Sequence, residues 1–186
     1  MYHWLVHFQT QRPIPTLPRL DEMASETILS PAYRNYGKFR TGETHCLFKY
    51  TLKGEGVFAD SEGEHRVPEG SGFLCEIYDP RTGYYYPKDG TEPWTFVWMV
   101  FDGEAARHMT REIVSRHGPV FTIPKDSAEI QRMLESRKHD GTTPAITPTW
   151  GARVVTDLLL ALAATKEEPH EERPERVLIR RAQQIV

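Results

Sequence analysis

The stretch Pro93-Trp94-Thr95-Phe96-Val97-Trp98-Met99-Val100-Phe101-Asp102-Gly103 decides the fold of this chain. Aromatic and β-branched side chains dominate it, and a proline and a glycine bound it, which predicts a β-strand. Side chains alternate across a strand, so one face carries Trp94, Phe96, Trp98 and Val100. Both faces are largely apolar. The strand is therefore predicted to lie inside a sandwich or barrel, where its aromatic wall either fills the core or lines a ligand pocket.

The length and composition are those of an ordinary soluble protein. At 186 residues and a formal net charge of −3, the chain has room for one domain, or a domain with a helical appendage, and no overall basic footprint for nucleic acid. Cys46 and Cys75 fall on separate predicted strands and are expected to be reduced thiols in a cytoplasmic protein rather than a disulfide. The N-terminus lacks a signal-peptide pattern, and the longest apolar run, 154–164, is shorter than the ~20 residues that span a bilayer.

The first half of the chain has the pattern of short strands separated by turns. Residues 2–8 alternate in polarity and predict a first strand or an ordered arm, whereas the prolines in 11–20 predict irregular extended chain. Residues 32–40 mix aromatic and basic side chains, as at a strand edge or pocket lip. From Thr44 an apolar face, formed by Cys46, Phe48, Tyr50 and Leu52, alternates with His45, Leu47, Lys49 and Thr51. Glycine- or proline-bearing turns about every ten residues then predict an all-β barrel or sandwich.

The second half changes to a helical period. Residues 104–117 predict a modest amphipathic helix, and Asp126 or Ser127 is placed to cap another that runs to Lys138. Residues 142–148 predict a link, and 151–165 predict the strongest helix. Residues 166–176 have the composition of a charged linker, and 177–186 begin a further amphipathic helix.

Four motifs in order resemble the N-terminal sensing domain of AraC/XylS-family transcription regulators. They are Lys53-x-Glu55-Gly56, Val67-Pro68-Glu69-Gly70, Tyr84-x-Tyr86 and Pro93-Trp94-x-Phe96-x-Trp98-x-x-Phe101-x-Gly103. The resemblance runs from about Arg40 to Gly103 and implies a mostly β fold: a cupin-like double-stranded β-barrel (jelly roll) followed by C-terminal α-helices. It implies an effector-binding barrel with an N-terminal arm in 1–125, a helical dimerisation region in 126–165, a charged linker in 166–176, and the start of a DNA-binding domain in 177–186.

The resemblance also implies where a small effector binds. The matching positions, inside the barrel against the aromatic strand, are Arg40, Tyr84, Tyr86, Trp94, Phe96 and Trp98. An aromatic ring can stack on the apolar face of a sugar, while an arginine fork and tyrosine hydroxyls fix its orientation or clamp a carboxylate. A sugar or sugar derivative is the first expectation and an aromatic or organic acid the second. A filled barrel without a ligand is the third.

The strongest predicted helix carries an apolar stripe that admits two interpretations. The stripe consists of Val154, Val155, Leu158, Leu159 and Leu162. In the simplest interpretation it packs on its own barrel. The resemblance implies in addition that this helix pairs with its twin across a two-fold axis, and so predicts a homodimer.

Catalytic and metal-binding patterns are missing from the sequence. Cupin enzymes hold a metal with a His-x-His pair, a later histidine and a carboxylate, and this chain has no His-x-His pair and no Gly-x-Ser-x-Gly elbow. We therefore predict no catalytic residue, metal or cofactor, no membrane partner, and DNA contact only through a helix-turn-helix domain outside this chain. The alternatives are a free-standing cupin enzyme, an isomerase or dioxygenase of a small polar metabolite, or a purely structural domain.

Overall fold

A computed structural model describes residues 2–167 of the chain. The strands of the barrel are β1 (Tyr2–His7), β3 (Arg19–Ile28), β4 (Arg34–Tyr36), β5 (Cys46–Lys53), β6 (Glu55–Asp60), β7 (Gly63–Pro68), β8 (Ser71–Glu76), β9 (Gly83–Tyr85), β10 (Trp94–Asp102) and β11 (Val120–Thr122). A small parallel pair joins β2 (Gln9–Thr10) to β12 (Ala145–Ile146). The helices are α1 (Glu104–His117), α2 (Ala128–Glu135), α3 (Pro148–Ala164) and the 3-10 turns η1 (Gly37–Phe39) and η2 (Ser136–His139).

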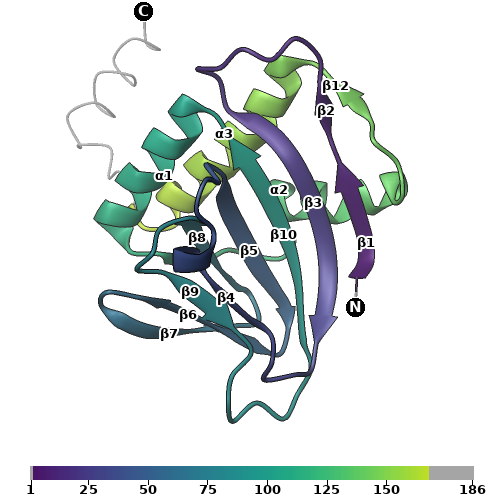
Figure 1. Cartoon of the computed structure of the whole chain (residues 1–186). Coiled ribbons are helices and arrows are strands. Elements are labelled where there is room, and N and C mark those ends of the chain that lie inside the picture. The colour runs from purple at the N-terminus through teal and green to yellow at the C-terminus, as the bar shows by residue number, and fades with distance from the viewer. Residues whose placement is uncertain (1, 168–186) are drawn as a thin grey trace, which may run out of the picture.

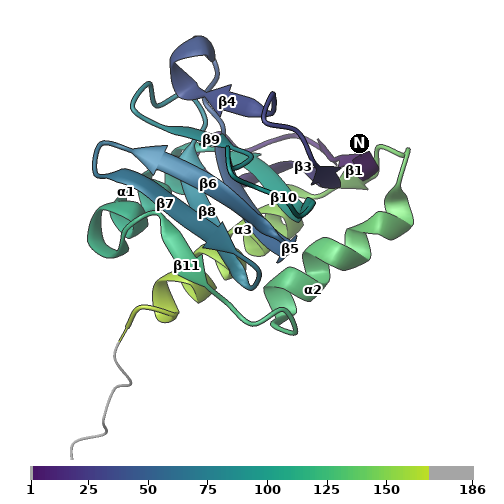
Figure 2. The ribbon, with the colours of Figure 1, turned by 90° about the horizontal axis from the view of Figure 1, so that it is seen from below.

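Two antiparallel sheets face each other. The larger has six strands in the order β1-β3-β10-β5-β8-β11, and the smaller has four in the order β4-β9-β6-β7. Consecutive strands such as β5 and β6 lie in different sheets, which is the strand exchange of a jelly roll. Figures 1 and 2 show α1 and α3 on the side of the large sheet that faces away from the small one. The predicted mostly β, cupin-like barrel with C-terminal helices is confirmed.

The aromatic strand β10 lies between β3 and β5 near the middle of the large sheet. Its two faces are both buried, as the sequence predicts. Trp94, Phe96 and Trp98 belong to the core between the two sheets, which we call the inter-sheet core. Val97, Met99 and Phe101 belong to the core between the large sheet and the helices, the helix-side core. Burial on both faces explains why the strand contains almost no polar residue.

Strand β3 was not predicted, and its neighbour β1 is more firmly placed than an arm. The pairing of β3 with both β1 and β10 makes it central to the sheet. Its sequence has acidic residues at inward positions, which obscures the alternation that predicts a half-buried strand. Residues 2–7, predicted to form a first strand or an ordered arm, form a strand of the same sheet, and Val6 is fully buried.

The helices begin and end close to the predicted residues. Helix α1 has the predicted bounds, and α2 begins after the predicted cap Ser127, whose hydroxyl accepts from the amide of Ile130. Helix α3 begins three residues earlier than predicted, at Pro148, because proline suits the first turn and Thr147 caps the amide of Trp150.

The apolar stripe of α3 packs on the chain's own sheet. Its five residues, Val154, Val155, Leu158, Leu159 and Leu162, lie in the helix-side core and are at most 3% exposed. The structure thus agrees with the simpler of the two interpretations of this stripe. Its part in an interface between two copies of the chain stays a prediction.

Other expectations fall partly or wholly outside the described residues. Most of the predicted linker 166–176 and all of the predicted helix 177–186 lie beyond residue 167. Cys46 and Cys75 are free, buried thiols. Burial raises the pKa of both, that of Cys46 to about 12. In the described part of the chain, no helix combines the length and apolarity needed to cross a membrane.

Candidate functional site

A polar cavity of about 230 Å³ opens between the two sheets of the barrel. Strands β1, β3, β5 and β10 of the large sheet and β4 and β9 of the small sheet contribute to its wall. The apolar and aromatic lining consists of Tyr2, Tyr33, Leu47, Ile77, Tyr84, Trp98 and Val100. The polar lining consists of Glu22, Glu26, Asn35, Arg40 and Lys49. Aromatic walls with a few polar groups are the usual composition of a small-molecule site.

Strand register explains how charged residues reach the inside of the barrel. Trp98 lies opposite Lys49 of β5 and Ala24 of β3, and Phe96 lies opposite Glu26 of β3. Directly opposed residues of an antiparallel pair point to the same face of the sheet. The alternation that turns the aromatic wall of β10 inward therefore turns Lys49 and Glu26 inward as well.

Lys49 is a buried cation surrounded by aromatic rings. It is 2% exposed, and its ammonium donates one hydrogen bond of 2.7 Å to the hydroxyl of Tyr33. Its Nζ lies 3.8 Å from the ring centroid of Phe96, 4.6 Å from that of Tyr84 and 5.5 Å from that of Trp94. Burial lowers the pKa of Lys49 from its ordinary 10.5 to about 7. The ring faces act in the other direction, because they attract the charged form.

Glu26, on β3, is the acidic counterpart of Lys49, on β5, in the lining of the same cavity. It is 9% exposed, and its Oε1 accepts a hydrogen bond of 2.7 Å from the indole Nε1 of Trp98. This bond fixes the ring of Trp98 in the cavity wall, because an indole has a single donor. Among residues 2–167, neither Lys49 nor Glu26 has an ion-pair partner within 4.0 Å.

The rim of the cavity holds further charges that are already paired. Arg40 follows η1 and has its Nη1 3.3 Å from Glu43 Oε2. Glu22 Oε1 lies 3.0 Å from His7 Nδ1. The Arg40 side chain is about one-third exposed, so it can turn its guanidinium toward a ligand at little cost. Two cations and two carboxylates thus line the cavity. Lys49 and Glu26, which have no ion-pair partner among the described residues, are the more deeply buried of the four.

The structure brings three of the six predicted ligand positions to the cavity. Arg40, Tyr84 and Trp98 line it. The other three, Tyr86, Trp94 and Phe96, are 2% exposed or less and are packed in protein around it. Tyr86 donates to the carbonyl of Glu92 over 2.9 Å, Trp94 donates to Thr51 Oγ1 over 3.0 Å, and Phe96 underlies Lys49 Nζ.

Sequence reasoning missed Lys49, Glu26 and Tyr33 as cavity residues. Tyr33 lies in the aromatic and basic segment that was expected to form a pocket lip, so its region was predicted although its role was not. The available signal for Lys49 was that it is the one charged residue between Cys46 and Leu52, in an otherwise apolar strand. Glu26 had no such signal, since β3 was not predicted.

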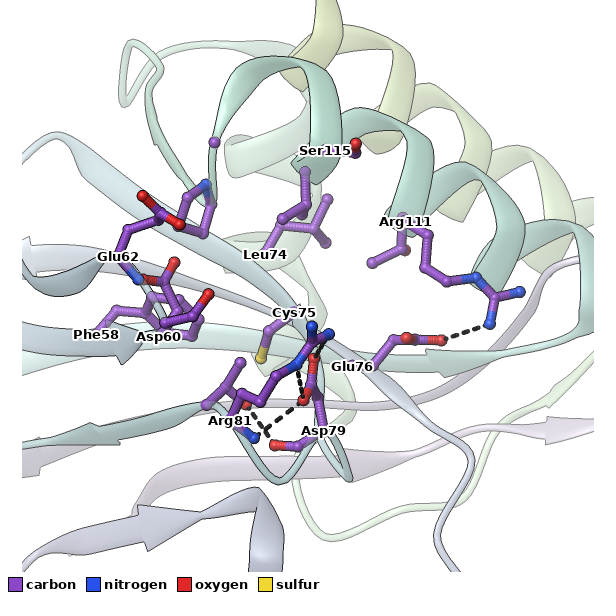
Figure 3. A pocket seen from close by; sticks show the side chains of 16 residues that line it. Phe58, Asp60, Glu62, Leu74, Cys75, Glu76, Asp79, Arg81, Arg111 and Ser115 are labelled. Carbon is purple, nitrogen blue, oxygen red and sulfur yellow. Dashed lines mark hydrogen bonds and ion pairs between the residues drawn. The ribbon is translucent and has the colours of Figure 1, made fainter.

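A larger hollow, of about 620 Å³, lies on the outside of the barrel between α1, β8 and the loop at 79–82 (Figure 3). Its charged side chains are mostly paired with each other: Arg81 bonds Asp79, and Arg111 bonds Glu76. No buried charge without a partner faces it among the lining residues. We therefore assign the candidate site to the inner cavity. Within residues 2–167, no group of three or more His, Cys, Asp or Glu side chains comes together as metal ligands would.

Residues 24–139, more than half of the 186, match the family described as the AraC-like ligand-binding domain. The chain belongs to this family. Its cavity therefore lies in an AraC-like sensing domain of the kind that transcription regulators use to bind small-molecule effectors. No curated protein matches the sequence.

Several solved structures are similar to this AraC-like domain at low identity and low TM-score. The AraC-like transcriptional activator CuxR is 12% identical, with 83% of this chain and 54% of that chain covered, at a TM-score of 0.44. YhaK from Escherichia coli is 21% identical, with 55% of this chain and 45% of that chain covered, at a TM-score of 0.41. Ectoine synthase from P. lautus is 14% identical, with 57% of this chain and 71% of that chain covered, at a TM-score of 0.30. The chain spans about half the length of CuxR and of YhaK.

Proposed function

We propose that this AraC-like domain senses a sugar or sugar derivative, which it binds in the inner cavity without converting it. The observation that carries the proposal is the composition of that cavity. Trp98 and Tyr84 present aromatic surfaces, while Lys49, Arg40 and Glu26 present hydrogen-bonding groups from other sides. A sugar ring has an apolar face and a periphery of hydroxyls, so it matches both kinds of surface.

The size of the cavity supports a ligand of monosaccharide size. Its 230 Å³ equals about eight water molecules at ~30 Å³ each. A single six-membered sugar ring with its substituents fits such a space, whereas a disaccharide does not unless the rim opens. Arg40 and Tyr2 lie at that rim, and Tyr2 is 54% exposed.

In this proposal the six ligand positions predicted from the sequence divide into residues that contact the effector and residues that support the cavity wall. Arg40, Tyr84 and Trp98 contact the effector directly, because they line the space that it would fill. Tyr86, Trp94 and Phe96 support that wall from behind, as their burial indicates. Lys49, Glu26 and Tyr33 are added to the contact residues.

We further propose that the domain acts as a cytoplasmic homodimer and reaches DNA through a C-terminal helix-turn-helix domain that is not part of this chain. The effector must bind two states of the dimer unequally in order to shift one toward the other. In this proposal 1–125 form the sensing barrel, 126–165 the helical region that carries the dimer surface, 166–176 the linker, and 177–186 the first residues of the next domain.

The dimer surface in this proposal is the outward face of α3. This face carries Trp150, 43% exposed, and Leu160, 57% exposed, with Arg153 between them. Large apolar side chains that stand in water on one helix face support contact with another protein surface. The inward stripe, which contacts the sheet, holds the helix in place for that contact.

A thermal-shift titration with the full chain tests the sensing proposal. A ligand at a hundred times its dissociation constant adds roughly 2.7 kcal/mol to the free energy of unfolding, a readable rise in Tm. We expect a selective rise with one group of stereochemically related monosaccharides or their derivatives. A rise with divalent metals only, and with no sugar or sugar derivative in the panel, would contradict the proposal and favour a cupin enzyme.

A further inference from the structure

The two charged groups deepest in the cavity have incomplete sets of partners. An ammonium has three donors, and Lys49 Nζ uses one of them on an oxygen, the Tyr33 hydroxyl. Its other neighbours are ring faces. Glu26 has acceptor sites on two oxygens, and Oε1 receives the indole of Trp98. Buried charges are normally paired or fully hydrogen-bonded, so both groups retain capacity for a ligand.

The chemistry that satisfies both groups together is specific. Lys49 needs an oxygen acceptor and gains most from a negatively charged one, because a buried cation is stabilised by an opposite charge. Glu26 needs a donor, which a hydroxyl supplies. The guanidinium of Arg40, on the same cavity, matches the two oxygens of a carboxylate.

We propose that the effector is a hydroxylated carboxylic acid of monosaccharide size, a uronic or aldonic acid, whose carboxylate binds Lys49 and Arg40 and whose hydroxyls bind Glu26. This inference rests on the proposed sensing function and narrows its ligand class. Lys49 then discriminates the acid from the neutral sugar of the same skeleton. A neutral sugar leaves the buried ammonium without an anion and gains only a neutral hydrogen bond there.

The arrangement has a consequence that distinguishes it from ordinary sugar binding. A carboxylate beside Nζ favours the charged form and raises the pKa of Lys49 above the value of about 7 that burial gives it. Binding of the acid at a pH above 7 therefore takes up a proton, and the affinity falls as the pH rises. Binding of a neutral sugar takes up few protons, because no new negative charge enters.

Calorimetric titration of the full chain with matched pairs tests the inference. The probes are D-galacturonate with D-galactose, D-glucuronate with D-glucose, and L-arabinonate with L-arabinose. Each is titrated at about pH 8 in two buffers of different ionisation enthalpy, which gives the number of protons taken up. We expect one acid to bind at least tenfold more tightly than its neutral partner, with uptake approaching one proton.

The decisive variant is Lys49→Met. Methionine is unbranched and packs well against aromatic rings, so the barrel keeps its shape. We expect the acid's affinity to fall by about 30-fold or more, as when one member of a buried charge pair is removed, and the proton uptake to vanish. Lys38→Met is the matched control, because Lys38 also stands over aromatic rings, 5.0 Å from the centroid of Phe39, but does not line the cavity. Its affinity and proton uptake should equal those of the unmodified chain.

The possible outcomes distinguish a failure of the acid inference from a failure of the sugar-sensing proposal. Preferential binding of a neutral sugar, or acid binding that Lys49→Met leaves unchanged, overturns the acid inference and leaves the sensing function in place. Failure of every acid and every neutral sugar to bind overturns the sugar-sensing proposal itself. If Lys49→Met unfolds, as urea denaturation would show, the matched pairs in the unmodified chain decide, and an acid that binds no more tightly than its neutral partner contradicts the inference.

Discussion

The indole nitrogen of Trp98 donates a buried hydrogen bond of 2.7 Å to the carboxylate of Glu26. This bond joins β10 to β3 on the inward face of the large sheet, at the wall of the cavity. It holds the most accessible ring of the aromatic strand in one orientation and fixes a carboxylate beside it. An aromatic surface and an acceptor at a constant relative position are what recognition of a hydroxylated ring requires.

Trp98→Phe removes this bond and keeps most of the aromatic packing. The buried carboxylate of Glu26 then loses its indole donor, which costs about 1–3 kcal/mol of the free energy of unfolding and weakens effector binding. Trp94→Phe is the matched control, since it also removes a buried indole bond, to Thr51, but does not line the cavity. Urea denaturation and calorimetry of both variants measure the two effects. Equal losses of affinity in the two variants would show that Trp98 has no special part in binding.

Lys49 makes the stability of the domain depend on pH in a specific direction. Its pKa is lowered in the folded state, from 10.5 to about 7, so between these values the folded protein binds fewer protons than the unfolded one. The free energy of unfolding contributed by this group therefore rises with pH from about 7 to 10.5, by at most ~1.36 kcal/mol per pH unit. Lys49→Met should lack this rise and be more stable than the unmodified domain below pH 7, by on the order of 1–4 kcal/mol. Urea denaturation across this pH range measures it, and identical pH profiles of the two proteins would contradict it.

Substitutions at two adjacent residues of α3 test the stability of the fold and the association of two chains independently. Leu159 is fully buried, and Leu160 is 57% exposed on the opposite face. Leu159→Glu places a charge in the helix-side core and should reduce the free energy of unfolding by at least about 4 kcal/mol. Leu160→Glu should leave stability within ~0.5 kcal/mol and dissociate the dimer. Sedimentation velocity measures whether Leu160→Glu dissociates the proposed dimer. A dimer that persists in this variant would exclude the outward face of α3 as its interface.

Gly56 gives a purely steric test of the inter-sheet core. A Cβ at this residue of β6 would overlap the indole ring of Trp94, and the backbone of Gly56 is not in the left-handed region. Gly56→Ala should therefore destabilise the fold by about 1–3 kcal/mol through overpacking. In a Trp94→Leu background the same glycine substitution should cost less, because the smaller side chain leaves space for the methyl group. Two additive losses in thermal denaturation would mean that the two residues do not compete for the same space.

The sequence was sufficient to predict the strands and helices in which the buried side chains are the apolar ones. Both faces of β10 are apolar, so its position between two layers followed from residues 94–101, and α1 was predicted residue by residue. The failures have one physical cause. Reasoning from polarity assumes that inward-facing residues are apolar, whereas β3 and β5 turn Glu26 and Lys49 inward toward a polar cavity. These two residues break the local rule at the candidate site, which is where such exceptions are expected.

The stripe of α3 shows a second limit of the sequence. Its periodicity revealed an apolar face but not which surface covers that face, because a helix packed on its own sheet and a helix at a dimer interface have the same pattern. In the structure the stripe packs on the sheet, and pairing with a second copy stays a prediction. Prediction of the ligand positions from family resemblance had a similar limit, since three of the six positions line the inner cavity and the other three are buried behind them.

The position of Trp98 allows the central claim, that the effector lies in the inner cavity, to be measured directly. In a ¹⁵N-labelled protein, each indole N–H gives its own NMR signal, and the chain has four tryptophans. Of these, Trp98 lines the cavity, Trp94 is packed beside it, and Trp150 stands on the outer face of α3. We predict that saturation with the effector shifts the signal of Trp98 most, that of Trp94 less and that of Trp150 not at all in the absence of a change in association. An unmoved Trp98 signal, with shifts in backbone amides of Arg81 and Arg111 at the outer hollow, would contradict the claim and assign binding to the outside of the barrel.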